Sequence, residues 1–493
     1  MNNTKRNSSA EAITVLVICA VIVLNLILGT LVKSFGLAVY AEESVDLSVG
    51  DVGDTLFADA IEKGKRVTVT FCMYEDDVAA HSTGKYVYRT AKEFEEKYPD
   101  FIELNYVNAL TQLDASGRFF DFEKYKTDMR GKGNKIYTTS IIFECDGVYR
   151  VITDAVTSAG YADFFTLDSS FVATSYNGEE FFASMVAWVL NPEHGTAYFT
   201  KGHGETATLT LYNLLTCAGY YVEELNLKLR EIPDDADLVI ISNPRSDFER
   251  AAAGSTVRTE TEMERLHTYA QRGGNFFVAL DPYTKSLPVL ESFLSEFGIG
   301  FFETDEGERQ IVKDFSDAIT TDGFTLVTSL AAGEHTAPVR EVIRDGRVII
   351  KDAAALALSG EAKPLLTASS SAVCQSGGTT TDTAGSYVLA AASSLANEDA
   401  ESAKMFAISS IYLAAADAII TNGYSNKDFI YSLFDTFFGM GDMPYGCRSV
   451  VYDNQILENL TMGTARLYTA ALVAIPVLIA AAGVFVIVRR KNR

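Results

Sequence analysis

The chain is 493 residues long, with 48% apolar and 22% charged residues. A domain commonly has about 150 residues, so this length predicts two or three folded units, and the composition excludes a disordered or collagen-like chain. Aspartate and glutamate number 65 against 41 lysines and arginines, which gives a formal net charge of -24. Such a charge repels phosphate backbones, so the sequence argues against a nucleic-acid partner.

Two uncharged stretches near the chain ends predict membrane spans. Residues 12–32 and 467–488 contain no charged side chain, and each is long enough to cross a hydrocarbon core about 30 Å thick. Basic residues precede the first stretch and follow the second, which places residues 1–11 and 489–493 in the cytoplasm. We therefore expect a cell-membrane protein with both termini cytoplasmic and residues 34–465 extracytoplasmic.

A cleavable signal peptide covering residues 1–41 is the alternative, because Ala41 is the small residue that a signal peptidase needs before its cut. The apolar stretch is longer than the 7–15 residues usual for a signal peptide, which favours a retained anchor.

Residues 40–190 predict a small α/β domain from their alternating and periodic apolar patterns. The strands are expected at residues 67–72, 101–107, 140–145 and 148–152, and the helices at 83–98, 119–129 and 179–190. This order resembles thioredoxin-like folds, in which Cys72 would lie at the position of the redox pair. Glu75 stands where the second cysteine would be, so dithiol chemistry is not expected.

Residues 191–300 and 386–445 predict a doubly wound α/β domain, because strands alternate with helices as in a parallel sheet. Its strands are expected at residues 196–200, 221–225, 238–242, 276–280, 387–391 and 405–411, and its helices at 206–218, 261–272 and 429–438. Residues 301–385 are expected to be an excursion of short strands that contains an exposed, flexible loop at 368–385.

The candidate ligand-binding site consists of polar and glycine residues that follow three predicted parallel strands. Its members are Gly202, His203, Gly204, Glu205, Asn243 and Asp281. Ligands of open parallel sheets bind outside the carboxyl ends of the strands, and glycines let the backbone approach a ligand closely. The alternative is purely structural: the glycines serve a helix-entry turn, His203 makes a local hydrogen bond, and Glu205 complements the helix dipole.

Several chemistries lack their sequence motif. The chain has no phosphate-binding P-loop, no zincin or EF-hand pattern and no G-x-S-x-G, and its five histidines are dispersed. Its six cysteines are widely spaced without a C-x-x-C pair. We therefore expect no cofactor, no metal site and no catalytic residue, and any ATP hydrolysis would belong to another chain.

Four segments resemble one family, the auxiliary component of uncharacterised ABC transport systems, related to gliding-motility-associated transporters. They are residues 198–205, 232–244, 269–274 and 279–282. The resemblance implies a membrane-anchored extracytoplasmic subunit that works with separate ABC ATPase and permease subunits, and a central domain similar to glutamine amidotransferases. The turn at 202–204 lacks the amidotransferase nucleophile.

The expected function is therefore a non-enzymatic accessory subunit of an ABC-type transport complex. Two alternatives stay open. One is an extracytoplasmic hydrolase centred on His203, Glu205 and Asp281, and the other is a scaffold that binds a surface polymer.

The two predicted spans give a testable topology. A tag at either terminus should resist protease added outside intact cells, because the basic flanks keep both tips in the cytoplasm. Immunoblotting of the tags before and after cell lysis measures this protection, and digestion of either tag in intact cells would refute the topology.

Overall fold

The computed structural model describes residues 47–451, apart from 154–160, 169, 171, 207, 250–259, 306, 345, 377–378, 381–382, 398–399 and 422. The predicted spans at 12–32 and 467–488 and the cytoplasmic tips at 1–11 and 489–493 lie outside these residues. Among the helices that are described, none is both long enough and apolar enough to cross a membrane.

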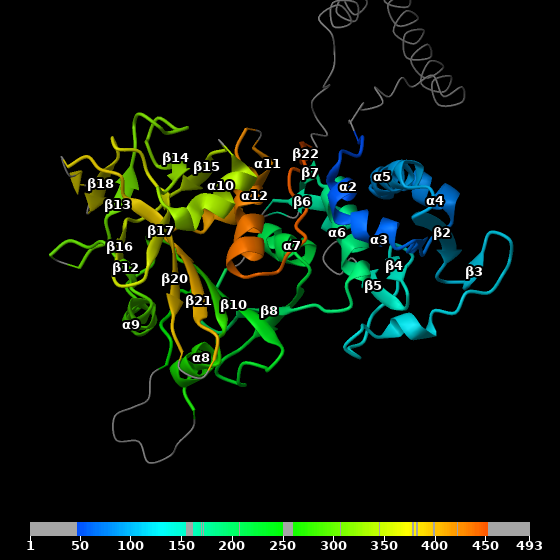
Figure 1. The fold of residues 1–493 in the computed structure, drawn as a ribbon, viewed down its shortest axis with the longest axis horizontal. Coiled ribbons are helices and arrows are strands. Elements are labelled where there is room, and N and C mark those ends of the chain that lie inside the picture. Colours follow the sequence, from blue (N-terminus) through cyan, green and yellow to red (C-terminus); the bar gives the residue numbers. More distant parts are fainter. Residues whose placement is uncertain are drawn as a thin grey trace, which may run out of the picture. The chain divides into compact units, whose positions relative to one another are not determined.

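A five-stranded mixed sheet forms the first part of the chain, in the order β3-β2-β1-β4-β5 (Figure 1). Its strands are β1 (Val67–Phe71), β2 (Ile102–Asn108), β3 (Leu113–Asp114), β4 (Ile141–Cys145) and β5 (Val148–Ile152). Strands β1 and β2 are parallel, whereas β4 is antiparallel to both β1 and β5. Helix α5 (Gly84–Lys97) packs on β2, and helix α6 (Gly178–Leu190) packs on β4 and β5. The small helices α2 (Val52–Leu56), α3 (Ala58–Glu62) and α4 (Glu75–Ala80) precede α5.

The helix predicted at residues 119–129 is wrong. The structure has a 3-10 turn there, η1 (Glu123–Lys126), which is followed by an extended residue, Thr127. Two aromatic side chains, Phe122 and Tyr125, are buried in a local cluster, and the Asp128 carboxylate accepts hydrogen bonds from backbone amides that follow it. Tertiary burial and side-chain bonding to the backbone thus replace helical hydrogen bonds in this segment.

Five parallel strands form the centre of the large sheet, in the order β9-β8-β10-β11-β21. They are β8 (Thr196–Thr200), β9 (Tyr221–Leu225), β10 (Ala236–Ser242), β11 (Asn275–Ala279) and β21 (Ala403–Ile408). The positions predicted for β8 and β9 match these bounds, and β21 ends three residues earlier than predicted. The predicted α/β fold class with a parallel sheet is confirmed.

Helices cover both faces of this sheet (Figure 1). On one face, α8 (Glu262–Gln271) and α9 (Pro288–Glu296) pack on Phe276 and Val278 of β11. On the other face, Phe277 of the same strand meets Phe434, which follows α12 (Asn426–Ser432) in a π-helical turn. Helix α7 (Leu209–Cys217) contacts α12. Alternate residues of a strand therefore feed two cores, as a doubly wound sheet requires.

The interpretation of residues 301–385 as an excursion with an exposed loop needs correction. Strand β20 (Val388–Leu395) is antiparallel to β21 and continues the large sheet through β17 (Lys363–Thr367), β14 (Thr325–Leu330) and β15 (Val348–Lys351). Strands β12 (Ile299–Phe301) and β16 (Leu356–Leu358) pair beside them. The small-residue stretch at 368–385 contains β18 (Val373–Ser376) and β19 (Thr379–Thr380), which form a separate sheet with β13 (Ile311–Lys313). The short strands were expected, but a single sequence does not show which strands pair, so their continuation of the large sheet was not predicted.

Both ends of the described chain pack against one segment. Strand β22 (Val450–Val451) pairs with β7 (Ala173–Tyr176), which also pairs with β6 (Phe165–Leu167). At the other end, the Gly50 amide donates to the Glu179 carboxylate at the start of α6, at 2.7 Å. The chain therefore enters and leaves this region beside the β7–α6 segment.

Candidate functional site

The carboxyl ends of β8, β10 and β11 lie at one edge of the large sheet, since these neighbouring strands are parallel. Strand β9 lies on one side of β8 and β10 on the other, so the order of the strands reverses between β8 and β10. Crevices for ligands form at such reversal points in open α/β sheets. We call the residues that follow these three strands the carboxyl-edge cluster: Gly202, His203, Gly204, Glu205, Asn243, Arg245 and Asp281.

His203 lies between two carboxylates. Its Nδ1 is 3.0 Å from Glu205 Oε1, and its Nε2 is 3.0 Å from Glu262 Oε2 in the first turn of α8. The backbone amide of His203 also donates to Glu205 Oε2, at 2.6 Å. The Phe248 ring stacks on the imidazole with a centroid separation of 4.1 Å. Every polar atom of the imidazole is therefore occupied within the protein.

Burial and charge set the protonation of this group. The His203 side chain is 0% exposed, and those of Glu205 and Glu262 are 5% and 2% exposed. Burial alone would lower the pKa of His203, but the hydrogen bond to Glu205 and the charge of Glu262 outweigh it and raise the pKa. Burial likewise opposes ionisation of Glu205, yet its hydrogen bonds from His203 lower its pKa. The geometry is that of an imidazolium held by two carboxylates.

The turn around His203 ties the neighbouring loops together. The backbone carbonyl of His203 accepts hydrogen bonds from the backbone amides of Arg245 and Ser246, at 2.7 and 3.0 Å. Gly204 has a φ of +74°, and a Cβ there would lie 3.2 Å from Arg245 Cβ, so a glycine is needed for this approach. Gly202 likewise has a φ of +121°. Both glycines therefore serve the turn.

Asn243 is fully buried at 0% exposure and has a φ of +52°. Its backbone N–H donates to the Ala279 carbonyl at 2.7 Å, and its side-chain Nδ2 donates to Thr206 Oγ1 at 2.7 Å. Left-handed backbone is tolerated by asparagine better than by most residues. Asn243 thus joins the carboxyl ends of β10 and β11 to the loop after β8.

Asp281 lies at the same edge and pairs with Arg245, whose Nη1 is 3.3 Å from Asp281 Oδ2. Asp281 Oδ1 also accepts the Tyr283 amide at 2.9 Å. The Arg245 side chain is 53% exposed and that of Asp281 is 15% exposed, so this pair is the accessible part of the cluster.

The predicted site residues therefore share one edge, and most of them interlock. His203 contacts Glu205, but no contact joins it to Asp281, which is connected to the turn through Arg245. Sequence reasoning missed Glu262, Phe248 and Arg245. The Thr261–Glu264 capping box was a readable signal that puts Glu262 in the first turn of α8, but not that it faces His203.

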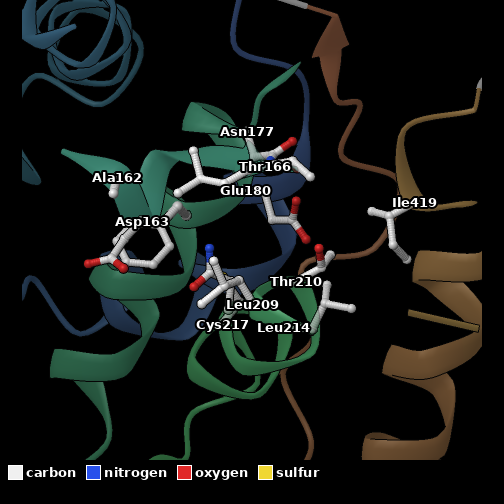
Figure 2. Close-up of a pocket in the computed structure, with 13 residues that line it drawn as sticks. Ala162, Asp163, Thr166, Asn177, Glu180, Leu209, Thr210, Leu214, Cys217 and Ile419 are labelled. Carbon is white, nitrogen blue, oxygen red and sulfur yellow. Dashed lines mark hydrogen bonds between the residues drawn. The ribbon is translucent and has the colours of Figure 1, made fainter. Parts of the chain in front are cut away.

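A second buried ionic group joins α6 to α12. Glu180 Oε2 is 2.8 Å from Lys427 Nζ, and the two side chains are 5% and 8% exposed. The Tyr431 hydroxyl donates to the other oxygen of Glu180. Figure 2 shows the Glu180 carboxylate beside Thr210 and Asn177 at a small cavity of about 40 Å³, which has room for a few waters at most. This group was also absent from the sequence-based prediction.

The cysteines show no reactive environment where they are described. Cys72 follows β1 and is 0% exposed, and burial raises the pKa of its thiol to about 12. Burial also raises the pKa of Cys217 well above its ordinary value. Thiols in such surroundings stay protonated, so neither residue has the properties of a nucleophile.

No protein-family model matches the chain, and no curated protein does. Among solved structures, the N-terminal domain of mmIFT52 aligns with a TM-score of 0.37 and 17% identity over 50% of this chain and 99% of its own. A ThuA-like protein from Bacteroides uniformis aligns with a TM-score of 0.31 and 10% identity, over 49% and 89%. A glutamine amidotransferase from Thermotoga maritima aligns with a TM-score of 0.28 and 10% identity, over 50% and 99%. These scores are too low to assign a fold family or a function.

Replacing the central histidine should destabilise the full-length protein strongly. In His203→Ala, two buried carboxylates lose their cation, and breaking such a group typically costs roughly 3–5 kcal/mol in the free energy of unfolding. The difference in the free energy of unfolding between wild type and variant should become smaller as the pH falls from 7 to 5, because the uncompensated carboxylates then take up protons. Denaturant unfolding at both pH values measures it, and His267→Ala is the matched control, because its pair with Glu296 is well exposed at 38% and 43%.

The free energy of unfolding of the wild-type protein should fall as the pH rises above neutrality. The pKa of His203 is raised in the folded state, so its stabilising contribution is complete below the ordinary value of 6.5 and is lost as pH rises through the raised value. A stability difference between wild type and His203→Ala that stays constant from pH 5 to pH 9 would contradict the ionic group.

The Glu180–Lys427 pair gives an independent prediction. Lys427→Met should lower the free energy of unfolding by roughly 3 kcal/mol, since it leaves Glu180 buried without its cation. The double variant Glu180→Leu/Lys427→Met should recover much of that loss, because no unpaired charge remains. Lys63→Met, which removes the exposed pair with Asp59, is the control and should change stability by less than about 1 kcal/mol. If the double variant lost as much stability as the single variants Glu180→Leu and Lys427→Met together, the result would argue against the pair.

Proposed function

We propose that the chain is a non-enzymatic, membrane-anchored accessory subunit of an ABC-type transport complex, in which separate chains supply the ATPase and the permease. The family resemblance of four sequence segments supports the transport role. One observation supports the non-enzymatic part of the proposal. Both ring nitrogens of His203 are bound by buried carboxylates. A general base must reach its substrate within hydrogen-bond distance, and an imidazole with 0% exposure has no free nitrogen to do so.

The proposal includes two fold assignments. The order β2-β1-β4-β5, with only β1 and β2 parallel among neighbours, supports a thioredoxin-like first domain at about residues 40–190. The parallel order β9-β8-β10-β11-β21 supports a glutamine-amidotransferase-like second domain without the nucleophile. In this role the first domain carries no dithiol and the second carries no reactive turn, so both act as binding scaffolds.

The position of the chain ends supports anchoring at two points. Gly50 bonds to the start of α6, and β22 pairs with β7 immediately before that helix. The described chain thus begins and ends beside one segment, which suits an anchor on each side of it. Coupling to the ATPase would pass through the permease, since only short tails are expected in the cytoplasm.

Affinity purification of the full-length chain from detergent-solubilised membranes tests the proposal. An ABC ATPase and a permease should copurify in constant ratio, and the chain purified away from them should hydrolyse no ATP above a mock preparation, because it lacks a phosphate-binding loop. Recovery of the chain without either partner, or ATP turnover by the chain alone, would refute it.

A matched variant separates this proposal from the hydrolase alternative. His203→Ala cannot do so, because it is expected to damage folding. Asp281→Asn keeps the size of the side chain and affects an accessible pair at the site surface. An accessory subunit should keep its partners and its cellular function in this variant, whereas a hydrolase that depends on Asp281 should lose activity while remaining folded.

A further inference from the structure

A cavity of about 480 Å³ lies between the large sheet and two helical segments, and no function described above uses it. Its walls are helix α10 (Ala337–Ile343) and the π-helical turn η5 (Leu433–Phe437), and its base is formed by β17 and β20. Helix α10 packs on α12, which leads directly into η5 (Figure 1). The volume is within the range of small-molecule sites. We call this space the sheet-face cavity.

Two short side chains at alternate positions of β20 form part of its base. Ala392 and Ser394 both line the cavity, and residues two apart in a strand point to the same face of a sheet. Ala392 is opposite Phe406 of β21, whose ring is 6.3 Å from the ring of Phe429 in α12. The cavity therefore lies on the face of the sheet that α12 covers. Under α12 phenylalanine rings fill the space above the strands, whereas Ala392 and Ser394 leave it open.

The rest of the lining is largely apolar. It includes Pro338 of α10, Leu365 of β17, and Leu433 and Phe437 of η5. Pro338 is exposed and Phe437 is half-buried, so apolar surface is available to a ligand. A concave space with mostly apolar walls and a few polar groups is typical of small-molecule sites.

One wall is an irregular helical segment whose end is held by a side chain. The Phe438 amide donates to the Leu433 carbonyl, five residues earlier, at 2.9 Å. Turns of this π-helical kind are rare in proteins and frequently occur at functional sites. Lys404 Nζ donates to the Phe437 carbonyl at 2.8 Å, which fixes the last residue of the turn beside the cavity.

A lysine gives the cavity a positive charge on its strand face. Lys363 of β17 is paired with Ala392, and directly paired residues of antiparallel strands share a face, so Lys363 is on the cavity side of the sheet. It is exposed, and no carboxylate in the described part of the chain forms an ion pair with it. Glu361, which also belongs to the lining, lies in the turn before β17. His335 Nε2 already donates to the Pro364 carbonyl at 2.7 Å.

We propose that the sheet-face cavity binds a small carboxylate that carries an alkyl chain. The chain lies against Leu365, Leu433 and Phe437, over the short side chain of Ala392, and the carboxylate lies beside Lys363. A neutral hydrocarbon leaves the lysine without a partner, and an alkylammonium ion is repelled by it. The proposal does not rest on the proposed transport function.

Protection of an introduced cysteine from labelling tests the proposal. Ser394 is exposed in the lining, whereas the native cysteines of the described chain are buried. In the full-length Ser394→Cys variant in lipid nanodiscs, butanoate, pentanoate and hexanoate should slow the reaction with a maleimide in a saturable way. The concentration for half protection should fall about fourfold with each added methylene, the equivalent of about 0.8 kcal/mol. No protection, or a half-protecting concentration that is the same for all three acids, would overturn the proposal.

A cysteine on the other face of the sheet is the matched control. Ser295 of α9 is exposed and lies outside the cavity lining, so Ser295→Cys should react at the same rate with and without hexanoate. Equal slowing of both cysteines would show non-specific binding and would overturn the proposal. The wild-type protein gives the background rate of its native cysteines.

The charge and the base of the cavity are tested in the Ser394→Cys background. Hexylammonium should protect at least about fivefold more weakly than hexanoate, and equal protection would overturn the assignment of a carboxylate. Lys363→Gln should weaken hexanoate binding by about threefold, as expected for an exposed ion pair, whereas Lys285→Gln, at an exposed lysine outside the lining, should not. Ala392→Leu should abolish protection, because the longer side chain fills the base, and protection that persists in it would overturn the site. The lysine variants change exposed positions, so they test the site even if Ala392→Leu fails to fold.

Discussion

The ionic group centred on His203 determines the architecture of the carboxyl edge. One imidazole contacts two buried carboxyl groups that come from different elements, the turn after β8 and the first turn of α8. Neither carboxylate could be buried alone at acceptable cost, because the desolvation of an unpaired charge is worth several kcal/mol. The turn that presents His203 also accepts the backbone amides after β10. These hydrogen bonds join the loops that follow β8 and β10 at the reversal point of the sheet.

The parts of the fold that the sequence predicts depend on local sequence patterns. The parts that it does not predict depend on contacts between residues far apart in the chain. The buried parallel strands at 196–200 and 221–225 are short apolar runs between turn residues, and their bounds can be read from the sequence alone. The segment around Phe122 and Tyr125 has a helix-like composition, yet burial of its aromatic rings decides otherwise. The carboxyl ends of parallel strands meet at one edge by geometry, so the gathering of His203, Asn243 and Asp281 was predictable.

What the sequence could not provide was the identity of the partners. Glu262 follows His203 by 59 residues, and Lys427 follows Glu180 by 247 residues. No local pattern encodes such pairs, because each residue alone reads as a surface charge on a helix. A single sequence therefore places a histidine at a ligand-binding edge but cannot tell whether its nitrogens are free or occupied. That distinction separates the two interpretations of His203, a catalytic base and a structural cation.

Helix α6 connects the remaining features of the molecule. Its first turn holds both ends of the described chain, through Glu179 and the adjoining strand β7. One residue later, Glu180 binds Lys427 and Tyr431 of α12, so a buried ion pair joins the same turn to α12. Its last turn contributes Trp188 to the lining of a cavity of about 380 Å³ beside the start of β10. Helix α6 therefore links both ends of the described chain, α12 and the lining of this cavity.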